Sequence, residues 1–487
     1  MTSRQANSNV PAMLKPFDDA LAEALQQSLP NLKLKPAEAR YLEEPRGKYS
    51  AHPTFVAAPL STDMVAEVVS FAGSARFGIQ PYGGGTGLVG GQVTPEGPTP
   101  LILSLENLNA IREVYPSEQA LIAEAGATIS DIQAAAEDLG LLFPLSYGSQ
   151  DSAQIGAGLS VNSGGLNVLR YGMARNLCLG IEAVLPDGTV HHGLKRLRKD
   201  NTGYDLRNLL IGAEGTLGVI TAASLKLVAK PARVATAFLA VSGPADALEI
   251  LQRLYDQAGE VISAFELLSG NGLRFLSDTY PDIRQPFASP PEWSVLLEIG
   301  TAASSDPSEV LATIFEAAIA DGLVSDGLIA QSGQQRDEMW AVREGIPAAN
   351  RMIGPVASHD ISLPLSVIPG FIDTAGAAIH GLAPFQVNPF GHLGDGNLHY
   401  NVFPPVGREA SEFADIAPEI TRLVHDLTME SGGSFSAEHG IGRMKVSELR
   451  RYGDPAKLAA MHKIKAALDP IGIMNPGAVL PRPLDKN

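Results

Sequence analysis

The feature that most constrains this chain is a loop with six glycines in nine residues, inside PYGGGTGLVGGQV at 81–93. Glycine adopts backbone conformations that other residues avoid, so such a loop can fold consecutive backbone N–H groups around an anion. Part of the loop, Gly85 to Gly90, also matches the G-x-G-x-x-G pattern, with Glu106 about 20 residues further on, where that pattern wants a ribose-binding carboxylate. That pattern needs a helix directly after the loop, and the three prolines of GQVTPEGPTP argue against one. We therefore expect a pyrophosphate-binding loop rather than a Rossmann fold, and a loop that merely turns remains the alternative.

Two further segments are rich in small residues, GSQDSAQIGAGLSVNSGGLNVLRYG at 148–172 and GAEGTLGVIT at 212–221. Few of their side chains are large enough to fill a cavity. Together with the first loop they indicate an extended ligand that lies against backbone, as a large planar cofactor would.

The chain changes texture near residue 231. Residues 81–220 read as strands and glycine-rich turns, whereas 234–330 alternate in the order β-α-β-β-α-β of a ferredoxin-like domain. Helices are expected at the N-terminus, after an N-cap at Ser61, and near the C-terminus, where Asp454 precedes Pro455. We predict an α+β protein with an N-terminal helical segment (1–50), a first domain (51–230), a second domain (231–440) and a C-terminal helical segment (441–487) that returns to the first domain.

Charge and cysteine content exclude several classes of protein. A net charge of −17 argues against a nucleic-acid partner. The single cysteine, Cys178, excludes an internal disulfide, a four-cysteine zinc site and a protein-ligated iron–sulfur cluster. The N-terminus does not resemble a secretory signal, and residues 209–228, the best candidate for a membrane span, contain Glu214 and Lys226. We expect a soluble, cytoplasmic protein with no transmembrane segment.

Two histidines lie seven positions apart in NPFGHLGDGNLHYNV at 388–402. Alternation along NLHYNVF predicts a strand in which His399 and Asn401 share a face, and the LGDG turn can return His392 toward His399. Glu438, in SAEHGIG at 436–442, is a candidate third ligand. Two imidazoles and a carboxylate are typical of a catalytic divalent metal, Zn²⁺ most readily. Hydrogen-bonded histidines beside an ordinary tight turn remain the alternative.

Several segments then occur in the order found in one family: PYGGGTGLVGG, VNSGGLNVLRYG, AVLPDGTV, NTGYDLRNLLIGAEGTLGVIT, GHLGDGNLHYNV, SAEHGIG and DPIGIMNPG. Over roughly residues 40–480 the chain resembles FAD-dependent 2-hydroxyacid dehydrogenases of the vanillyl-alcohol-oxidase (PCMH-type) superfamily, which include D-2-hydroxyglutarate dehydrogenase, D-lactate dehydrogenase and the glycolate oxidase catalytic subunit. The resemblance implies an FAD-binding domain, a ferredoxin-like substrate and metal domain, and an oxidoreductase activity.

The resemblance also assigns FAD contacts to residues of the glycine-rich segments. The residues implied are Gly83, Gly84, Gly85, Thr86, Gly87 and Leu88 for the pyrophosphate, Ser146, Gly148, Ser149, Gly156, Ser160, Asn162 and Gly165 along the cofactor, Glu214, Gly218 and Ile220 on the adenosine side, and Asn475 returning to the flavin. No histidine lies between His52 and His191, so a histidyl link from these loops is excluded and FAD is expected to bind non-covalently.

The same resemblance distributes roles in the second domain. It places His392, His399 and Glu438 on metal positions and His439 on the catalytic base, which also binds substrate. Arg343 would pair with the substrate carboxylate, and Asn401 would bind substrate or orient the metal site. This division suits the chemistry, because a flavin accepts hydride, a cation stabilises an alkoxide and a neutral imidazole accepts a proton.

Two positions depart from the pattern of hydroxyglutarate dehydrogenases. A threonine four residues after the arginine is replaced by Pro347, and a lysine before the D-hydrophobic-S-hydrophobic-P strand is replaced by Ser358. His359 would compensate only if the strand turned its other face. We therefore expect a lactate-like D-2-hydroxy acid as the substrate, with D-2-hydroxyglutarate as the alternative.

Two other functions compete with this interpretation. A metallohydrolase could use His392, His399 and Glu438, but it would leave the glycine-rich segments unexplained. A flavin-binding, non-catalytic subunit of an electron-transfer complex would not need the full set of histidines and glutamate. The sequence leaves open the electron acceptor (quinone, an electron-transfer flavoprotein or oxygen), peripheral attachment to a membrane through that acceptor, and assembly as a homodimer.

Overall fold

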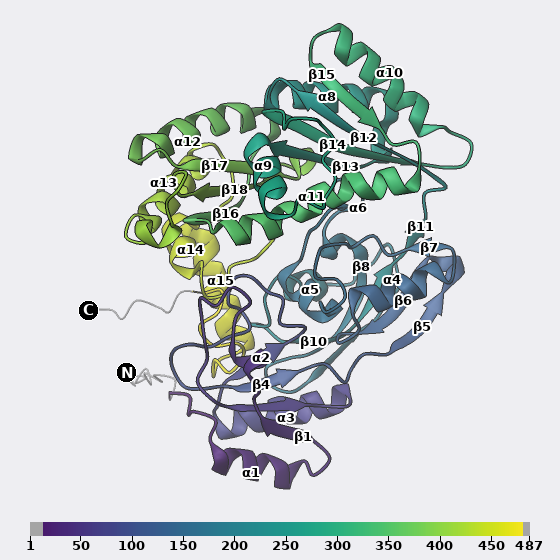
Figure 1. The fold of residues 1–487 in the computed structure, drawn as a ribbon. Coiled ribbons are helices and arrows are strands. Elements are labelled where there is room, and N and C mark those ends of the chain that lie inside the picture. Colours follow the sequence, from purple (N-terminus) through teal and green to yellow (C-terminus); the bar gives the residue numbers. More distant parts are fainter. Residues whose placement is uncertain (1–12, 481–487) are drawn as a thin grey trace, which may run out of the picture. The chain divides into compact units, whose positions relative to one another are not determined.

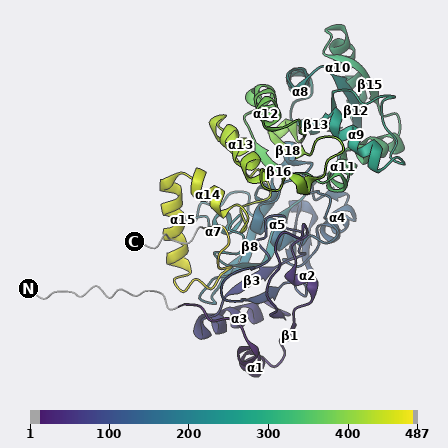
Figure 2. The ribbon, with the colours of Figure 1, turned by 60° about the vertical axis from the view of Figure 1, so that its left-hand side comes forward.

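The computed structural model describes residues 13–480, which divide into two compact units (Figure 1). Of the described residues, the first unit comprises 13–163, 173–229 and 439–480, and the second comprises 164–172 and 230–438. The second unit is therefore largely an insertion in the first, to which the chain returns at residue 439. The returning segment contains α14 (Val446–Tyr452) and α15 (Pro455–Leu468), drawn in yellow in Figure 2. Residues 164–172, expected in the first domain, pack with the second unit instead.

Two sheets form the framework of the first unit. Their strand orders are β1-β2-β4-β3 and β5-β6-β10-β8-β9, and β7 and β11 form a separate pair. The strands are β1 (Lys33–Pro36), β2 (Phe55–Ala58), β3 (Ile79–Tyr82), β4 (Leu101–Ser104), β5 (Ile111–Tyr115), β6 (Ala120–Glu124), β7 (Leu141–Leu142), β8 (Cys178–Val184), β9 (Val190–Gly193), β10 (Val219–Lys226) and β11 (Val228–Ala229). No helix lies between β3 and β4 in the described chain, as the prolines predict, so the loop at 83–91 is not part of a Rossmann unit.

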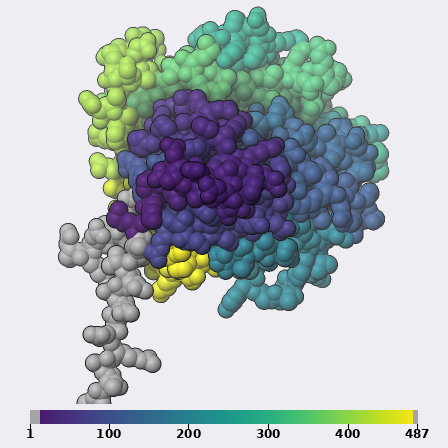
Figure 3. Space-filling model, turned by 90° about the horizontal axis from the view of Figure 1, so that it is seen from below, coloured from purple at the N-terminus to yellow at the C-terminus, as the bar shows by residue number. Residues whose placement is uncertain are grey.

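Helix α3 (Thr62–Ala75) contacts β8 and β9 and shares an apolar core with strands of both sheets. Val65, Val68, Val69 and Ala72 recur at helical spacing and are all fully buried, and Ser61 caps the helix by accepting a hydrogen bond from the Met64 N–H. Figure 3, a view from below, shows the N-terminal part of the chain in purple at the front of the molecule. The other helices of the first unit are α1 (Asp19–Ser28), α2 (Ala39–Leu42), α4 (Ile129–Glu137), α5 (Ile155–Val161), α7 (Leu206–Leu210), α14 and α15.

The C-terminal segment is fastened to the first unit beside β3. Asp454 caps α15, whose first residue is Pro455, as predicted. After α15 the backbone runs parallel to β3 through a bridge between Ile79 and Met474. The half-buried Arg443 guanidinium donates to the backbone oxygens of Gly90 and Gly91, to Thr94 and to Asn475. These bonds join the end of the chain to the glycine-rich loop.

A seven-stranded antiparallel sheet forms the second unit, in the order β15-β12-β14-β13-β17-β18-β16. Its first four strands are connected as β12-α8-β13-β14-α10-β15 with the spatial order of a ferredoxin-like domain, which confirms the predicted alternation. Helix α9 is inserted between β13 and β14. The strands are β12 (Arg233–Val241), β13 (Ile262–Ser269), β14 (Trp293–Thr301), β15 (Val324–Ile329), β16 (Ala357–Ser362), β17 (Gln386–Gly391) and β18 (Asn397–Phe403).

Each face of this sheet has its own apolar core. On one face, Phe265 and Leu267 of β13 pack with α8, α10, α12 and α13. On the other face, Ala264 and Leu268 pack with α9 and α11. Because side chains alternate along a strand, Glu266 lies on the α11 face. The helices are α6 (Val168–Tyr171), α8 (Pro244–Ala258), α9 (Gly270–Thr279), α10 (Pro307–Ala320), α11 (Gly333–Ile353), α12 (Ile368–Leu382) and α13 (Ala417–Glu430).

One stretch, Leu365–Leu382, has the length and mean hydropathy of a membrane-crossing helix, by those two criteria alone. It contains α12, whose Phe371, Ile372 and Ile379 belong to the core of the second unit. The segment 209–228 considered from the sequence is not a helix; it contains the end of α7, a turn and the buried strand β10.

Candidate functional site

A glycine turn brings the two histidines together, as predicted. Strands β17 and β18 are antiparallel neighbours, and the turn between them carries His392. Gly391 and Gly396 have φ values of 138° and 83°, which favour glycine. The ring centroids of His392 and His399 lie 5.6 Å apart. On β18, Leu398, Tyr400 and Val402 enter one core while His399 and Asn401 point to the other face, which confirms the predicted alternation.

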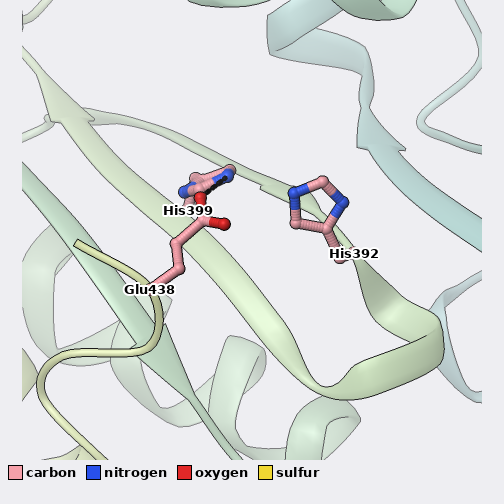
Figure 4. Close-up of side chains that lie close together, drawn as sticks. All are labelled: His392, His399 and Glu438. Carbon is pink, nitrogen blue, oxygen red and sulfur yellow. Dashed lines mark ion pairs between the residues drawn. The ribbon is translucent and has the colours of Figure 1, made fainter. Parts of the chain in front are cut away.

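Glu438 joins this pair from a distant part of the chain (Figure 4). Its Oε1 lies 3.9 Å from Nε2 of His399, and single ligand atoms of His392, His399 and Glu438 all lie within 4.8 Å of one another. The Glu438 N–H donates to Oδ2 of Asp360, which fixes the approach of this segment. A Cβ at Gly164 would lie 2.8 Å from Oε2 of Glu438, so a side chain there would displace the Glu438 carboxylate.

The two imidazoles have opposite electrostatic surroundings. Burial lowers the pKa of His399 to about 4, although Glu438 and Asp360 oppose that shift. Burial also disfavours a charged His392, but the adjacent Glu266 carboxylate prevails and raises the pKa of His392 to about 9. Burial raises the pKa of Asp395 in the intervening turn to about 6. His399 is therefore a neutral imidazole at pH 7, the form that binds a metal.

A second carboxylate, Glu266, lies behind His392 and was not identified from the sequence. Its Oε1 is 2.6 Å from Nδ1 of His392 and its Oε2 is 2.6 Å from Nε of Arg343. Burial would raise the pKa of Glu266, yet Arg343 and His392 together lower it to about 2. The only signal in the sequence was one acid inside the apolar strand ISAFELLS.

Asp360 supports the other side of the site and was also not identified from the sequence. Its Oδ1 accepts a hydrogen bond from Nδ2 of Asn397 and lies 3.9 Å from Nδ1 of His399. In β16, Asp360 is paired with His399 and Ser358 with Asn401, so these four side chains share a face. His359 points the opposite way, where its Nδ1 lies 3.4 Å from Nε2 of His425. His359 therefore does not compensate for the missing lysine.

The donor set suits a divalent cation. Two imidazoles and a carboxylate that converge from three segments match the ligands of catalytic zinc, and each histidine has a carboxylate on its far side. His439, the expected base, follows Glu438 directly in the chain and is the first residue of the returning segment of the first unit.

The glycine-rich loop of the first unit suits a pyrophosphate. Within the described chain, the backbone N–H groups of residues 84–92 have no hydrogen-bond partner, so consecutive donors remain for an anion. The loop packs so tightly that a Cβ on Gly84 would overlap the carbonyl oxygen of Ser152, and one on Gly83 would lie 2.6 Å from Cβ of Ala157. The available N–H groups and the close packing of the loop fit the pyrophosphate of FAD.

Two residues expected near the cofactor hold the loop and the C-terminal segment together. Both carboxylate oxygens of Glu214 accept backbone N–H groups, from Ile441 and Gly442, at 2.8 Å. The amide of Asn475 donates to the backbone oxygens of Gly91 and Glu214. Their side chains therefore act within the protein, and burial raises the pKa of Glu214.

The two units divide the residues expected at the site. The first unit contains residues 83–88, Ser146, Gly148, Ser149, Gly156, Ser160, Asn162, Glu214, Gly218, Ile220, His439 and Asn475. The second contains Gly165, Arg343, His392, His399, Asn401 and Glu438. Gly156 and Gly218 have packing reasons of their own, because a Cβ there would lie 2.6 Å from Cβ of Ala125 and 2.8 Å from the Val184 oxygen, respectively.

Comparison with known families gives two matches that together span most of the chain. Residues 53–193 match the family described as FAD binding domain, and residues 230–479 match the C-terminal domain of FAD linked oxidases.

Curated relatives are similar over nearly the whole chain. Mitochondrial D-2-hydroxyglutarate dehydrogenase of Arabidopsis thaliana is 36% identical over 441 residues, which is 90% of this chain and 77% of that protein. The Bos taurus mitochondrial enzyme is 35% identical over 92% of this chain and 80% of its own length. The D-2-hydroxyglutarate dehydrogenase of Xanthomonas citri pv. viticola is 34% identical over 93% of this chain and 95% of its own length.

Solved structures share the fold at much lower identity. p-Cresol methylhydroxylase with substrate bound aligns with a TM-score of 0.74 at 16% identity, covering 96% of this chain and 98% of that one. An alkyldihydroxyacetonephosphate synthase aligns with a TM-score of 0.70 at 17% identity, covering 95% and 86%. At this identity the likeness establishes the fold, which is the predicted α+β architecture of the vanillyl-alcohol-oxidase type.

Proposed function

This chain belongs to the FAD-linked oxidases of the vanillyl-alcohol-oxidase superfamily that are related to D-2-hydroxyglutarate dehydrogenases, and from that premise we propose that it oxidises D-2-hydroxyglutarate to the 2-keto acid with the help of a divalent metal. FAD-dependent oxidation of a 2-hydroxy acid follows from the family itself. The observation that carries the metal-dependent proposal is the convergence of His392, His399 and Glu438 within 4.8 Å.

The residues of the chain divide the work as follows. When bound, FAD would supply a hydride acceptor, and the cation, which we take to be Zn²⁺, would supply the positive charge that stabilises an alkoxide. His392, His399 and Glu438 hold the cation. Arg343 pairs with a substrate carboxylate, for which its planar guanidinium is suited. Asn401 orients the substrate, and His439 accepts the hydroxyl proton.

The identity of the acid is the point on which the sequence and the relatives disagree. Pro347 and Ser358 favoured a lactate-like acid, whereas the curated relatives named above are D-2-hydroxyglutarate dehydrogenases. Similarity over nearly the whole chain is stronger evidence than differences at two positions. The comparisons therefore support D-2-hydroxyglutarate, the alternative substrate. A lactate-like substrate remains the second candidate, because Pro347 offers no hydroxyl and the exposed Ser358 carries no charge.

Anaerobic flavin bleaching with a panel of D- and L-2-hydroxy acids, followed by steady-state kinetics, tests the proposal. We expect kcat/KM to be highest for D-2-hydroxyglutarate, and a chelator to abolish bleaching until Zn²⁺ is restored. A higher kcat/KM for D-lactate would select the second candidate. Bleaching that survives complete metal removal would contradict the role of the metal cluster.

The remaining properties complete the proposal. FAD is bound non-covalently, since the first two glycine-rich segments contain no histidine. With a single cysteine the chain has no iron–sulfur clusters of its own, so electrons pass to an external acceptor such as a quinone or an electron-transfer flavoprotein. We propose a cytoplasmic location and leave a homodimer to be tested by sedimentation.

A further inference from the structure

Glu266 is a buried charge in an apolar environment, which requires a reason. It lies at the centre of β13 and is 1% exposed. Around it on the same face are the apolar residues Ala264, Leu268, Trp340 and Phe390. An apolar side chain at this position would pack without the cost of burying a charge. The contacts that the carboxylate makes must therefore explain why a glutamate is present.

One oxygen of Glu266 determines which nitrogen of His392 is available to a metal. Its Oε1 lies 2.6 Å from Nδ1 of His392. A carboxylate only accepts hydrogen bonds, so Nδ1 keeps a proton, and Nε2 is the nitrogen that can release its proton and bind a cation. Metal-binding histidines are commonly oriented in this way by an acceptor on the far side of the ring.

The other oxygen holds the arginine that is expected to bind substrate. Oε2 of Glu266 lies 2.6 Å from Nε of Arg343, and the guanidinium also lies over the ring of Phe390, 5.1 Å from its centroid. In the described chain, Nε is the one nitrogen of Arg343 that donates a hydrogen bond. Both terminal nitrogens therefore remain for a ligand carboxylate, with the plane of the guanidinium already fixed.

We propose that Glu266 is a positioning residue that uses one oxygen for a metal ligand and the other for the substrate arginine, and so fixes the distance between the metal and the site of the substrate carboxylate. The proposal rests on the proposed function above. It identifies a residue outside the predicted ligand set whose loss should weaken both metal binding and substrate binding.

The chain provides a matched control on the same helix and the same sheet. Glu298 of β14 is 8% exposed and holds Arg336 of α11 through two contacts of 2.7 and 3.1 Å, and it also accepts from Nε1 of Trp340. Arg336 and Arg343 are seven residues apart on α11. Glu298 thus fastens the same helix to the same sheet, but it contacts neither His392 nor Arg343 among its recorded hydrogen bonds.

The decisive comparison is between Glu266→Gln and Glu298→Gln in the FAD-loaded protein. An amide has one acceptor end and one donor end, so it cannot accept from both Nδ1 of His392 and Nε of Arg343. We expect the Kd for Zn²⁺, measured by competition with a chromophoric chelator, to rise about 10- to 100-fold in Glu266→Gln. Glu298→Gln should leave it unchanged. Equal Zn²⁺ affinities in the two variants would overturn the proposal.

The second part of the proposal, that Glu266 holds the substrate arginine, is tested with the metal site filled. At saturating Zn²⁺, Glu266→Gln should still show a KM for D-2-hydroxyglutarate raised about tenfold or more, because a neutral amide holds the Arg343 guanidinium less firmly than a carboxylate does, even when its oxygen faces Nε. A KM equal to that of the wild type would overturn this half of the proposal. A residue that only stabilises the fold would change the melting temperature without this pattern.

A second pair of variants applies if Glu266→Gln does not fold. Replacing both partners of a buried ion pair by apolar residues is often tolerated, so Glu266→Met with Arg343→Met is compared with Glu298→Met with Arg336→Met. Only the first pair should weaken Zn²⁺ binding. Weakened Zn²⁺ binding in the variant, together with a wild type whose flavin no 2-hydroxy acid bleaches, would contradict the proposed function and support the role of Glu266. Bleaching of the wild type, together with an unchanged Zn²⁺ affinity in the variant, would do the reverse.

Discussion

At the scale of single residues, the distance to a carboxylate decides which of the two buried imidazoles is charged. His392 and His399 are seven positions apart in a glycine-rich segment and look equivalent in the sequence. In the fold, His392 contacts the Glu266 carboxylate at 2.6 Å, whereas the nearest carboxylate oxygens of Asp360 and Glu438 lie 3.9 Å from His399. The pKa values of the two rings are consequently shifted in opposite directions.

This difference predicts how the metal-free protein responds to acid. The pKa of His399 is lowered from 6.5 to about 4 by burial, so between these pH values the unfolded state binds a proton that the folded state does not. The free energy of unfolding therefore falls as the pH falls through this window, by on the order of 2 kcal/mol from this residue. His399→Gln should remove that contribution, as measured by urea unfolding in chelator at pH 6.5 and pH 4.

The quantity compared is the difference in the free energy of unfolding between wild type and variant at each pH. This difference is needed because Asp395 titrates in the same pH window with the opposite effect on stability. Its pKa is raised to about 6, so its contribution is lost as the pH rises. His52→Gln, a change at an exposed histidine, is the control and should give no such difference. A wild type and His399→Gln with parallel pH profiles would contradict the assignment.

At the scale of elements, the glycine-rich loop shows how packing and ligand binding require the same residues. Gly84 lies against the Ser152 carbonyl oxygen, and the N–H groups of 84–92 have no partner in the described chain. Glycine is thus needed both for the close approach of two chain segments and for binding an anion. The sequence predicted the anion site but could not show the close packing.

The substitution Gly84→Ala tests whether this loop binds FAD or is an ordinary turn. The added Cβ would overlap the Ser152 oxygen, so the backbone must shift, and we expect loss of most bound FAD with a free energy of unfolding lowered by about 2 kcal/mol. Gly370→Ala in α12 is the control, since nothing lies within 4 Å of its Cβ. Flavin absorbance after gel filtration and a thermal melt measure the two effects. Full retention of FAD in Gly84→Ala would contradict the assignment of the loop.

At the scale of the whole molecule, the glycine-rich loop and the candidate metal ligands belong to different units. The three candidate metal ligands lie in the second unit, and the N–H groups of the glycine-rich loop lie in the first. The long excursion of the chain at 230–438 thus carries the whole metal cluster.

Hydrogen exchange should therefore distinguish the two cofactors. Zn²⁺ at 100 times its Kd stabilises the states that bind it by about 2.7 kcal/mol. We expect the protection to appear at 386–403 and around Glu438, with residues 84–92 unaffected. Adding FAD should protect 84–92. Zn²⁺-dependent protection confined to the glycine-rich loop would contradict the metal assignment.

The sequence by itself determined the features that depend on local spacing. Alternation along NLHYNVF set the face of His399, the β-α-β-β-α-β order set the ferredoxin-like half, and the prolines after Gly91 excluded a Rossmann helix. Ordered motifs then indicated the family. Only the tertiary structure decided which side chains support the site. Glu266, Arg343 and His392 are separated by 126 residues from first to last. They meet because β13 and β17, which His392 follows, are neighbours in one sheet and α11 packs on its face. Periodicity specifies which face a residue occupies, but the partner across that face is set by long-range packing, which no local pattern encodes.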